Sequence, residues 1–159
     1  MSADAVVDAL LTSCVVVTSR DTAPRGCLVG SVMPVGYAAG VVAFALTTGG
    51  RTERAVAASG VAVLHVLAAT DLTTAQVFAG DVDRFAAVQW APGALGAPVL
   101  TAATGVLELV ITASCSAGGC TVFCGEVRHA SGAPGEVLTI TEIRAAGVEA
   151  ARTSTEGSA

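Results

Sequence analysis

Residues 83–100 read DRFAAVQWAPGALGAPVL, and this stretch carries the most specific pattern in the sequence. An Asp-Arg-Phe triplet opens it, and GAPVL (96–100) closes it. Trp90, Pro92 and Gly93 lie between them. Proline and glycine at this spacing are typical of turns and interrupt any continuing helix. We therefore predict that WAPGALGAPVL is a loop that connects a helix to the last strands of a β-structure.

Working outward from this loop, the neighbouring segments predict short helices and strands. DLTTAQVFAG (71–80) opens on an Asp cap and ends on glycine, the start and stop signals of a short helix. RTERAVAAS (51–59) predicts a second helix, capped by Thr48 or Gly49. Alternating apolar, often β-branched residues predict strands over 13–19, 26–33, 40–46, 61–67, 105–114, 121–130 and 136–143. The first two strands are joined by a hairpin.

The ends of the chain complete a single domain. Ser2–Leu11 has apolar residues at helical spacing and predicts a short amphipathic helix. The 159 residues suffice for one core, so we expect one domain over residues 1–149 and a flexible C-terminal tail over 150–159. The fold class is mostly β with short helices. Strands apolar on both faces need cover on both sides, which a closed barrel and a partner subunit supply, so a homodimer is expected.

Composition excludes several classes of function. Hydrophobic residues make up 53% of the chain and charged residues 13%, and residues 26–50 carry no charge. Gly30, Pro34 and Gly36 divide that run into two strand-sized pieces, so we interpret it as buried strands and not as a membrane span. The net charge of −5 without a basic cluster argues against nucleic acid. The N-terminus lacks the basic start of a secretory signal, so a cytoplasmic location is expected.

Five cysteines form an odd set, which favours free thiols over a disulfide framework. Cys120 and Cys124 have no second cysteine pair, so no metal site is predicted. A thiolate could act as a nucleophile or base, although no Lys or His neighbours these thiols to lower their pKa. Buried cysteines also serve as small apolar packing residues. Both interpretations stay open.

In order and spacing, these segments resemble the flavin reductase-like, FMN-binding split-barrel family from about Ala5 to Arg144. The matching motifs are VVVTS (15–19), Arg25-Gly26, RTERAVAASGVAVLHVL (51–67), DRF (83–85), Trp90, Pro92, Gly93, GAPVL (96–100), VLELV (106–110) and VFCGEV (122–127). The resemblance implies a homodimeric split β-barrel of Greek-key type. It also implies that FMN or FAD lies against the second and third strands.

The resemblance places a flavin phosphate beside the Arg-Thr helix start. A helix N-terminus has free N–H groups and a positive dipole end, and Arg51 and Thr52 add further donors. A plain solvated helix start is the alternative. The candidate cofactor-binding residues are Cys27, Leu28, Gly30, Ser31, Thr47, Thr48, Arg51, Thr52 and Phe85.

Three departures from the family pattern bear on activity. Leu28, Val29 and Gly30 precede Ser31 where relatives have a threonine and small polar residues. GYAAG (36–40) replaces a proline-containing acidic segment. Gly118-Gly119-Cys120 replaces a Gly-Asp-His motif associated with nicotinamide binding, which makes that motif degenerate. Cys120 thereby becomes the candidate catalytic residue, and Cys27, His65 and Cys120 are the candidate substrate-cleft residues. For His65, a structural role in the core or at an interface is the alternative.

The resemblance implies an oxidoreductase that takes hydride from NADH or NADPH, reduces FMN or FAD, and supplies a partner monooxygenase. Cofactors carry this chemistry, so the loss of the His and Asp side chains weakens the reductase hypothesis without excluding it. One alternative is an enzyme of specialised metabolism on the same fold that acts, with or without a cofactor, on a small apolar metabolite. Another is a non-catalytic flavin or haem-type binding module.

Overall fold

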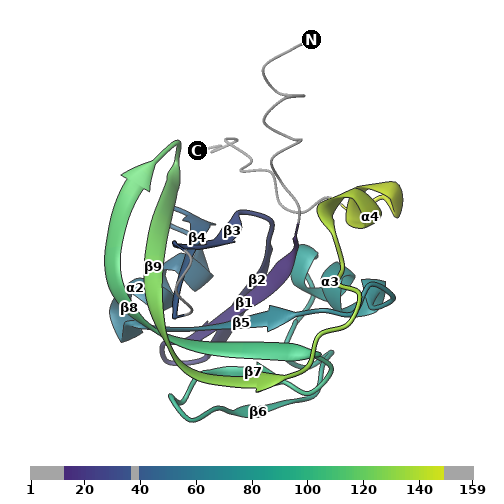
Figure 1. The fold of residues 1–159 in the computed structure, drawn as a ribbon, viewed down its shortest axis with the longest axis horizontal. Coiled ribbons are helices and arrows are strands. Elements are labelled where there is room, and N and C mark those ends of the chain that lie inside the picture. Colours follow the sequence, from purple (N-terminus) through teal and green to yellow (C-terminus); the bar gives the residue numbers. More distant parts are fainter. Residues whose placement is uncertain (1–12, 37–39, 149–159) are drawn as a thin grey trace.

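The computed structural model describes residues 13–36 and 40–148, and its main feature is a seven-stranded antiparallel sheet. The strand order is β2-β1-β5-β8-β9-β4-β3. Its strands are β1 (Val15–Arg20), β2 (Pro24–Val29), β3 (Val32–Pro34), β4 (Val41–Thr47), β5 (Val61–Val66), β8 (Gly105–Ala117) and β9 (Cys120–Gly132). Figure 1 shows that the sheet curls strongly, with β8 and β9 forming a long hairpin along one side. The predicted mostly-β class is confirmed.

The two edge strands of the sheet, β2 and β3, are consecutive in the chain. Gly30 and Ser31 alone separate them, and the Ala45 N–H donates to the Ser31 carbonyl at 3.0 Å. The single strand predicted over 26–33 is therefore wrong, because the backbone turns a corner at Gly30. A Cβ at that corner would lie 2.3 Å from Ile140 Cδ1, so another residue there would have to displace the end of the Ile140 side chain. The corner curls the sheet into a half-barrel.

Alternate residues of the strands fill the interior of the half-barrel, as the twofold period of a strand requires. Val15 and Val17 of β1 point inward with Leu64 of β5. Phe44 of β4 and Phe123 of β9 stack with ring centroids 5.6 Å apart. The helix α2 (Arg51–Ser59) adds buried Val56 to this cluster.

Three elements cover the outer faces of the sheet. The helices α3 (Leu72–Ala79) and α4 (Ile140–Ala145) pack over β1 and β2 through a second apolar cluster. The strands β6 (Trp90–Pro92) and β7 (Pro98–Leu100) pair as a separate two-stranded sheet beside β5 and β8. The segment predicted as a loop, WAPGALGAPVL, therefore contains this small hairpin.

The observed helix starts can be compared with the predicted N-caps. Asp71 accepts a hydrogen bond from the Thr74 N–H at 3.1 Å, so the predicted cap of α3 is confirmed. The predicted cap of α2 by Thr48 or Gly49 is wrong, because its N-cap is Gly50, which offers no side chain. The hairpin between β1 and β2 is confirmed by their antiparallel register.

The strand predicted over 136–143 is also wrong. Only isolated bridges at Val137 and Thr139 remain of it, and the chain becomes helical at Ile140. Thr139 and Glu142 form a reciprocal capping box, which starts α4. The helix predicted over Ser2–Leu11 and the tail over 150–159 lie outside the described residues. No helix within 13–36 and 40–148 has the length and apolar character needed to cross a membrane.

Candidate functional site

An open cleft of about 900 Å³ lies where β2, the end of β4 and the start of α2 meet the segment 80–85. This is within the range of small-molecule and cofactor sites. Most of the predicted site residues line it: Cys27, Leu28, Gly30, Ser31, Thr47, Arg51, Thr52, Phe85 and Cys120. Thr48 and His65 are not among the lining residues. The structure thus gathers strands and a helix start that are far apart in the sequence.

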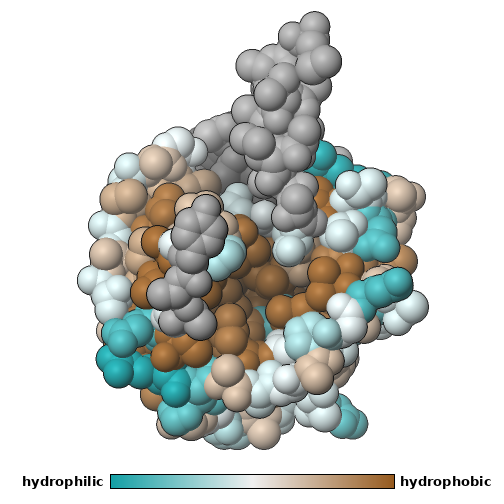
Figure 2. Space-filling view, in the orientation of Figure 1, coloured by the Kyte–Doolittle hydropathy of each residue, from teal (hydrophilic) through white to brown (hydrophobic). Residues whose placement is uncertain are grey.

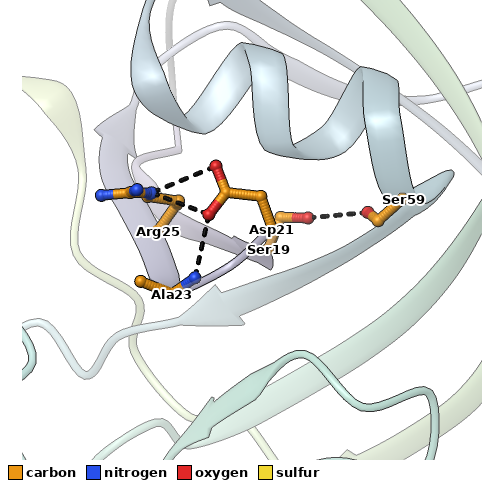
Figure 3. Close-up of polar contacts among 5 residues, drawn as sticks. All are labelled: Ser19, Asp21, Ala23, Arg25 and Ser59. Atoms are coloured by element: carbon orange, nitrogen blue, oxygen red, sulfur yellow. Dashed lines mark hydrogen bonds and ion pairs between the residues drawn. The ribbon is translucent and has the colours of Figure 1, made fainter.

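Three arginines line the cleft, and two are held by the protein itself. Arg25 pairs with Asp21, with Nε and Oδ1 3.1 Å apart (Figure 3). Arg84 donates to the Gly80 carbonyl at 3.1 and 2.9 Å and also to the Gly26 carbonyl. Arg51 is exposed, and within the described part of the chain its guanidinium has no such partner. Arg51 is therefore the cation available to an anionic ligand.

Two sets of hydrogen bonds stabilise the β1–β2 hairpin, which carries Arg25. Figure 3 shows the Asp21 carboxylate between the Arg25 guanidinium and the Ala23 N–H, which donates at 3.0 Å. These two contacts, the backbone one first, lower the pKa of Asp21. Ser19 on β1 hydrogen-bonds Ser59 at the end of α2, with 3.1 Å between the hydroxyl oxygens. This second contact anchors the helix that forms one wall of the cleft.

Hydroxyl and backbone donors surround Arg51. Ser31 and Thr47 are exposed, and among the described residues their hydroxyls have no protein partner. Thr52 is buried, at 6% exposure. The first N–H groups of a helix have no partner within the helix and attract anions. The start of α2 therefore combines a free guanidinium, hydroxyls and N–H donors in one corner of the cleft.

Two cysteines lie on the cleft walls. Burial raises the pKa of the Cys27 thiol, against the smaller opposite effects of a hydrogen bond with Thr52 and the charge of Arg84. Cys27 is therefore a neutral thiol near pH 7 and a poor nucleophile. Cys120 follows the Gly118-Gly119 turn and pairs with Thr47 in register. Cys124, predicted on the same strand face, does not line the cleft.

His65 is in the core and not in the cleft, which corrects its assignment to the substrate cleft. Its side chain is 0% exposed. Nε2 accepts the Leu100 N–H at 3.1 Å, so Nδ1 carries the proton and donates to the Val16 carbonyl at 3.0 Å. Burial lowers the pKa of His65 to about 4. The ring is a neutral structural link between β1, β5 and β7.

Arg84 and Glu53 are cleft residues that the sequence did not single out. The carbonyl partner of Arg84 at Gly26 lies 58 residues away in the chain, so no local pattern could indicate it. Its position within DRF, shortly after the end of α3 at Ala79, was the one available signal. Phe85 packs edge-on against Phe78 and Trp90, with centroids 5.6 and 5.8 Å away.

Within the described residues no group of three or more His, Cys, Asp or Glu side chains is placed to hold a metal.

The fold and this cleft define a class of protein, and comparison with known families gives the same one. The chain belongs to the flavin reductase-like domain family, whose model matches residues 8–144. The family match spans the half-barrel, the cleft and most of α4. A search of curated protein sequences finds no match.

Solved structures share the fold. The NADH:FAD oxidoreductase SgcE6 of Streptomyces globisporus C-1027, determined in complex with NAD and FAD fragments, is 30% identical with a TM-score of 0.71; the match covers 77% of this chain and 75% of SgcE6. A Sinorhizobium meliloti 1021 protein is 25% identical with a TM-score of 0.76. That match covers 86% of this chain but only 50% of the S. meliloti protein.

A further match shows likeness of fold alone. BorF, the flavin reductase component of a bacterial two-component tryptophan halogenase, is 21% identical with a TM-score of 0.70. The match covers 83% of this chain and 88% of BorF.

Proposed function

We propose that this chain binds FMN or FAD in the cleft and reduces it with NADH or NADPH, to supply reduced flavin to a partner monooxygenase. The observation that carries the proposal is Arg51 at the start of α2, whose guanidinium has no protein partner among the described residues. It lines a cleft of about 900 Å³ in a chain of the flavin reductase-like family. SgcE6 is an NADH:FAD oxidoreductase, which supports this class of hydride donor and cofactor.

The residues of the cleft fit a flavin nucleotide. A phosphate needs fixed cationic and neutral donors, which Arg51, Thr47 and the first N–H groups of α2 offer. A flat aromatic ring system needs apolar walls, which Leu28 and Phe85 supply. Neither wall carries a charge that would have to be desolvated.

The protein's part in the reaction is to bind and orient. A bound flavin supplies the ring that accepts hydride from the reduced nicotinamide, so the protein needs no nucleophile of its own. Arg51 and α2 fix the phosphate end, while β2 and Phe85 exclude water from the ring. Cys27 is neutral, so it presents no thiolate that could attack the ring. Rate then depends on how well the walls align the two rings.

A second candidate function keeps the fold and drops the reductase reaction. Cys120 lies in the cleft after Gly118-Gly119, where the family resemblance leads one to expect Asp and His. A cleft with thiols and apolar walls suits a small apolar metabolite. Cys120→Ser separates the two candidates, because a reductase tolerates this change and a thiol-dependent enzyme does not.

Arg51→Gln tests the proposal. The purified protein should quench FMN or FAD fluorescence and oxidise NADH or NADPH when flavin is added. Loss of the guanidinium should raise the flavin Kd about 10- to 100-fold, the value of a charge-assisted hydrogen bond to phosphate.

Arg54→Gln is the matched control, since Arg54 is exposed on α2 but does not line the cleft. Wild-type protein that binds neither flavin contradicts the proposal. Flavin binding without NADH or NADPH oxidation indicates a binding module instead.

A further inference from the structure

A chain of hydrogen bonds ties the start of α2 to the turn between β8 and β9. The Thr121 hydroxyl donates to Glu53 Oε1 at 3.0 Å, and the Gly49 N–H donates to Glu53 Oε2 at 3.2 Å. The hydroxyl oxygens of Thr48 and Thr121 are 3.1 Å apart. Since Thr121 gives its proton to the carboxylate, Thr48 is the donor of this last bond.

Backbone contacts extend the same connection. The Thr48 N–H donates to the Gly119 carbonyl, and the Gly50 N–H to the Thr47 carbonyl, both at 3.1 Å. The loop 47–50 is thus fixed at one end by β9 and at the other by the first turn of α2. Gly50, as N-cap, offers no side chain, and the Glu53 carboxylate accepts the Gly49 N–H instead.

The position of Glu53 makes this connection relevant to the cleft. Glu53 lines the cleft and lies two residues along the chain from Arg51, the cation available to an anionic ligand. A carboxylate with free oxygens in the cleft would repel an anionic ligand. Both oxygens of Glu53 are instead occupied by Thr121 and Gly49, so the carboxylate is held by neutral donors.

We infer that Glu53 and Thr121 are positioning residues for the phosphate end of the bound flavin nucleotide. They hold the loop 47–50 in place, and the Thr121 hydroxyl and the Gly49 N–H occupy both oxygens of Glu53. The inference rests on the proposed function and adds to it two residues that position the loop beside Arg51. It predicts that loss of the Thr121 hydroxyl weakens ligands with a phosphate and spares ligands without one.

The test compares FMN with riboflavin, which has the same ring system and no phosphate. In Thr121→Val, the Kd for FMN should rise about tenfold, the loss of one buried hydrogen bond, while the Kd for riboflavin stays within about twofold. Thr121→Ser keeps the hydroxyl and should restore FMN binding. Thr48→Val, an exposed change that breaks only the outer bond, should raise the FMN Kd about threefold.

Thr112→Val is the matched control, because Thr112 is an exposed threonine of the same hairpin whose hydroxyl donates to the Cys124 carbonyl. It should bind both ligands like the wild type. Equal losses for FMN and riboflavin in Thr121→Val would show mere structural support and overturn the inference, as would unchanged FMN binding.

A titration with inorganic phosphate distinguishes a failure of this inference from a failure of the proposed function. Wild-type protein that binds neither FMN nor FAD defeats the proposed function, and a phosphate titration followed by NMR at the Arg51 and Thr52 amides then decides the positioning role alone. Tighter phosphate binding by wild type and Thr121→Ser than by Thr121→Val supports the inference. Equal binding by all three overturns it.

Discussion

His65 illustrates how a single buried residue makes stability depend on pH. Its ring is fully enclosed and neutral, with a pKa lowered to about 4 mainly by burial. In the unfolded chain the same ring titrates near its ordinary value of 6.5. As pH falls through that window, the unfolded state takes up a proton that the folded state refuses. Stability is therefore greatest above pH 6.5 and declines toward pH 4.

The free energy of unfolding should fall by about 3 kcal/mol between pH 6.5 and pH 4, a value that follows from the size of the pKa shift. Urea denaturation at several pH values measures it. His65→Gln should be less stable at neutral pH but should lose this part of the pH dependence, and the exposed His129→Gln should keep it. Parallel pH profiles for wild type and His65→Gln would contradict the assignment.

Whether a site residue could be predicted from the sequence depended on how far along the chain its partners lie. Arg51 and Thr52 were predictable because a helix start is a local pattern with a known affinity for anions. A structural role in the core was one of the two interpretations of His65, and its burial confirms it. Its partners Val16 and Leu100 could not be predicted, since they come from distant strands. The role of Glu53 was hidden for the same reason, because Thr121 lies 68 residues further along the chain.

At the scale of elements, the β6–β7 hairpin depends on one buried carboxylate. Glu108 of β8 is 8% exposed and accepts N–H groups from Ala94 and Leu95, at 3.2 and 2.9 Å. A Cβ on Gly93 would lie 2.6 Å from its Oε2, so the turn packs directly against the carboxylate. The hairpin is thereby fixed to the sheet by a charged group and not by apolar contact alone.

Glu108→Gln should lower the free energy of unfolding by about 1–3 kcal/mol, because the amide loses one acceptor and sets an NH₂ against a backbone N–H. Chemical denaturation measures this loss. Glu126→Gln is the control, since Glu126 is exposed and its pair with Arg128 should contribute little. Equal stability of the Glu108 and Glu126 variants would refute the role of Glu108.

Element prediction succeeded where local signals agreed and failed where they competed. Asp71 and Gly80 frame α3 as expected. The residues VLTIT (137–141) have β-branched character, yet Thr139 and Glu142 form a capping box that starts a helix. The capping signal was present in the sequence and was outweighed by strand propensity. Gly30 marked a break in the chain, but its packing against Ile140 could not be predicted, because the two residues are far apart in the sequence.

At the scale of the whole molecule, apolar surface is left uncovered. Figure 2 shows apolar residues gathered in the hollow at the centre of one face. At the sheet edge, Met33 of β3 is 59% exposed and Val35, just beyond it, is 39% exposed. Exposed edge strands and apolar patches of this kind are typical of protein interfaces. We propose that a second copy of the chain covers this side of the molecule.

Sedimentation should therefore give twice the chain mass of 15.6 kDa. Met33→Arg should shift the protein toward the monomer, because it places a charge in the interface. Val82→Arg is the control, since Val82 is equally exposed, at 58%, but lies on the cleft rim. A monomeric wild type at micromolar concentration would contradict the dimer.

The corner at Gly30 also shows where this protein could be redesigned. One face of Gly30 borders the cleft, and its missing side chain points at Ile140 of α4. The cleft wall at that point is a single backbone thick, with the C-terminal helix directly behind it. Smaller residues at position 140 would let an engineer reshape the ligand space from outside, without altering any side chain that touches the ligand.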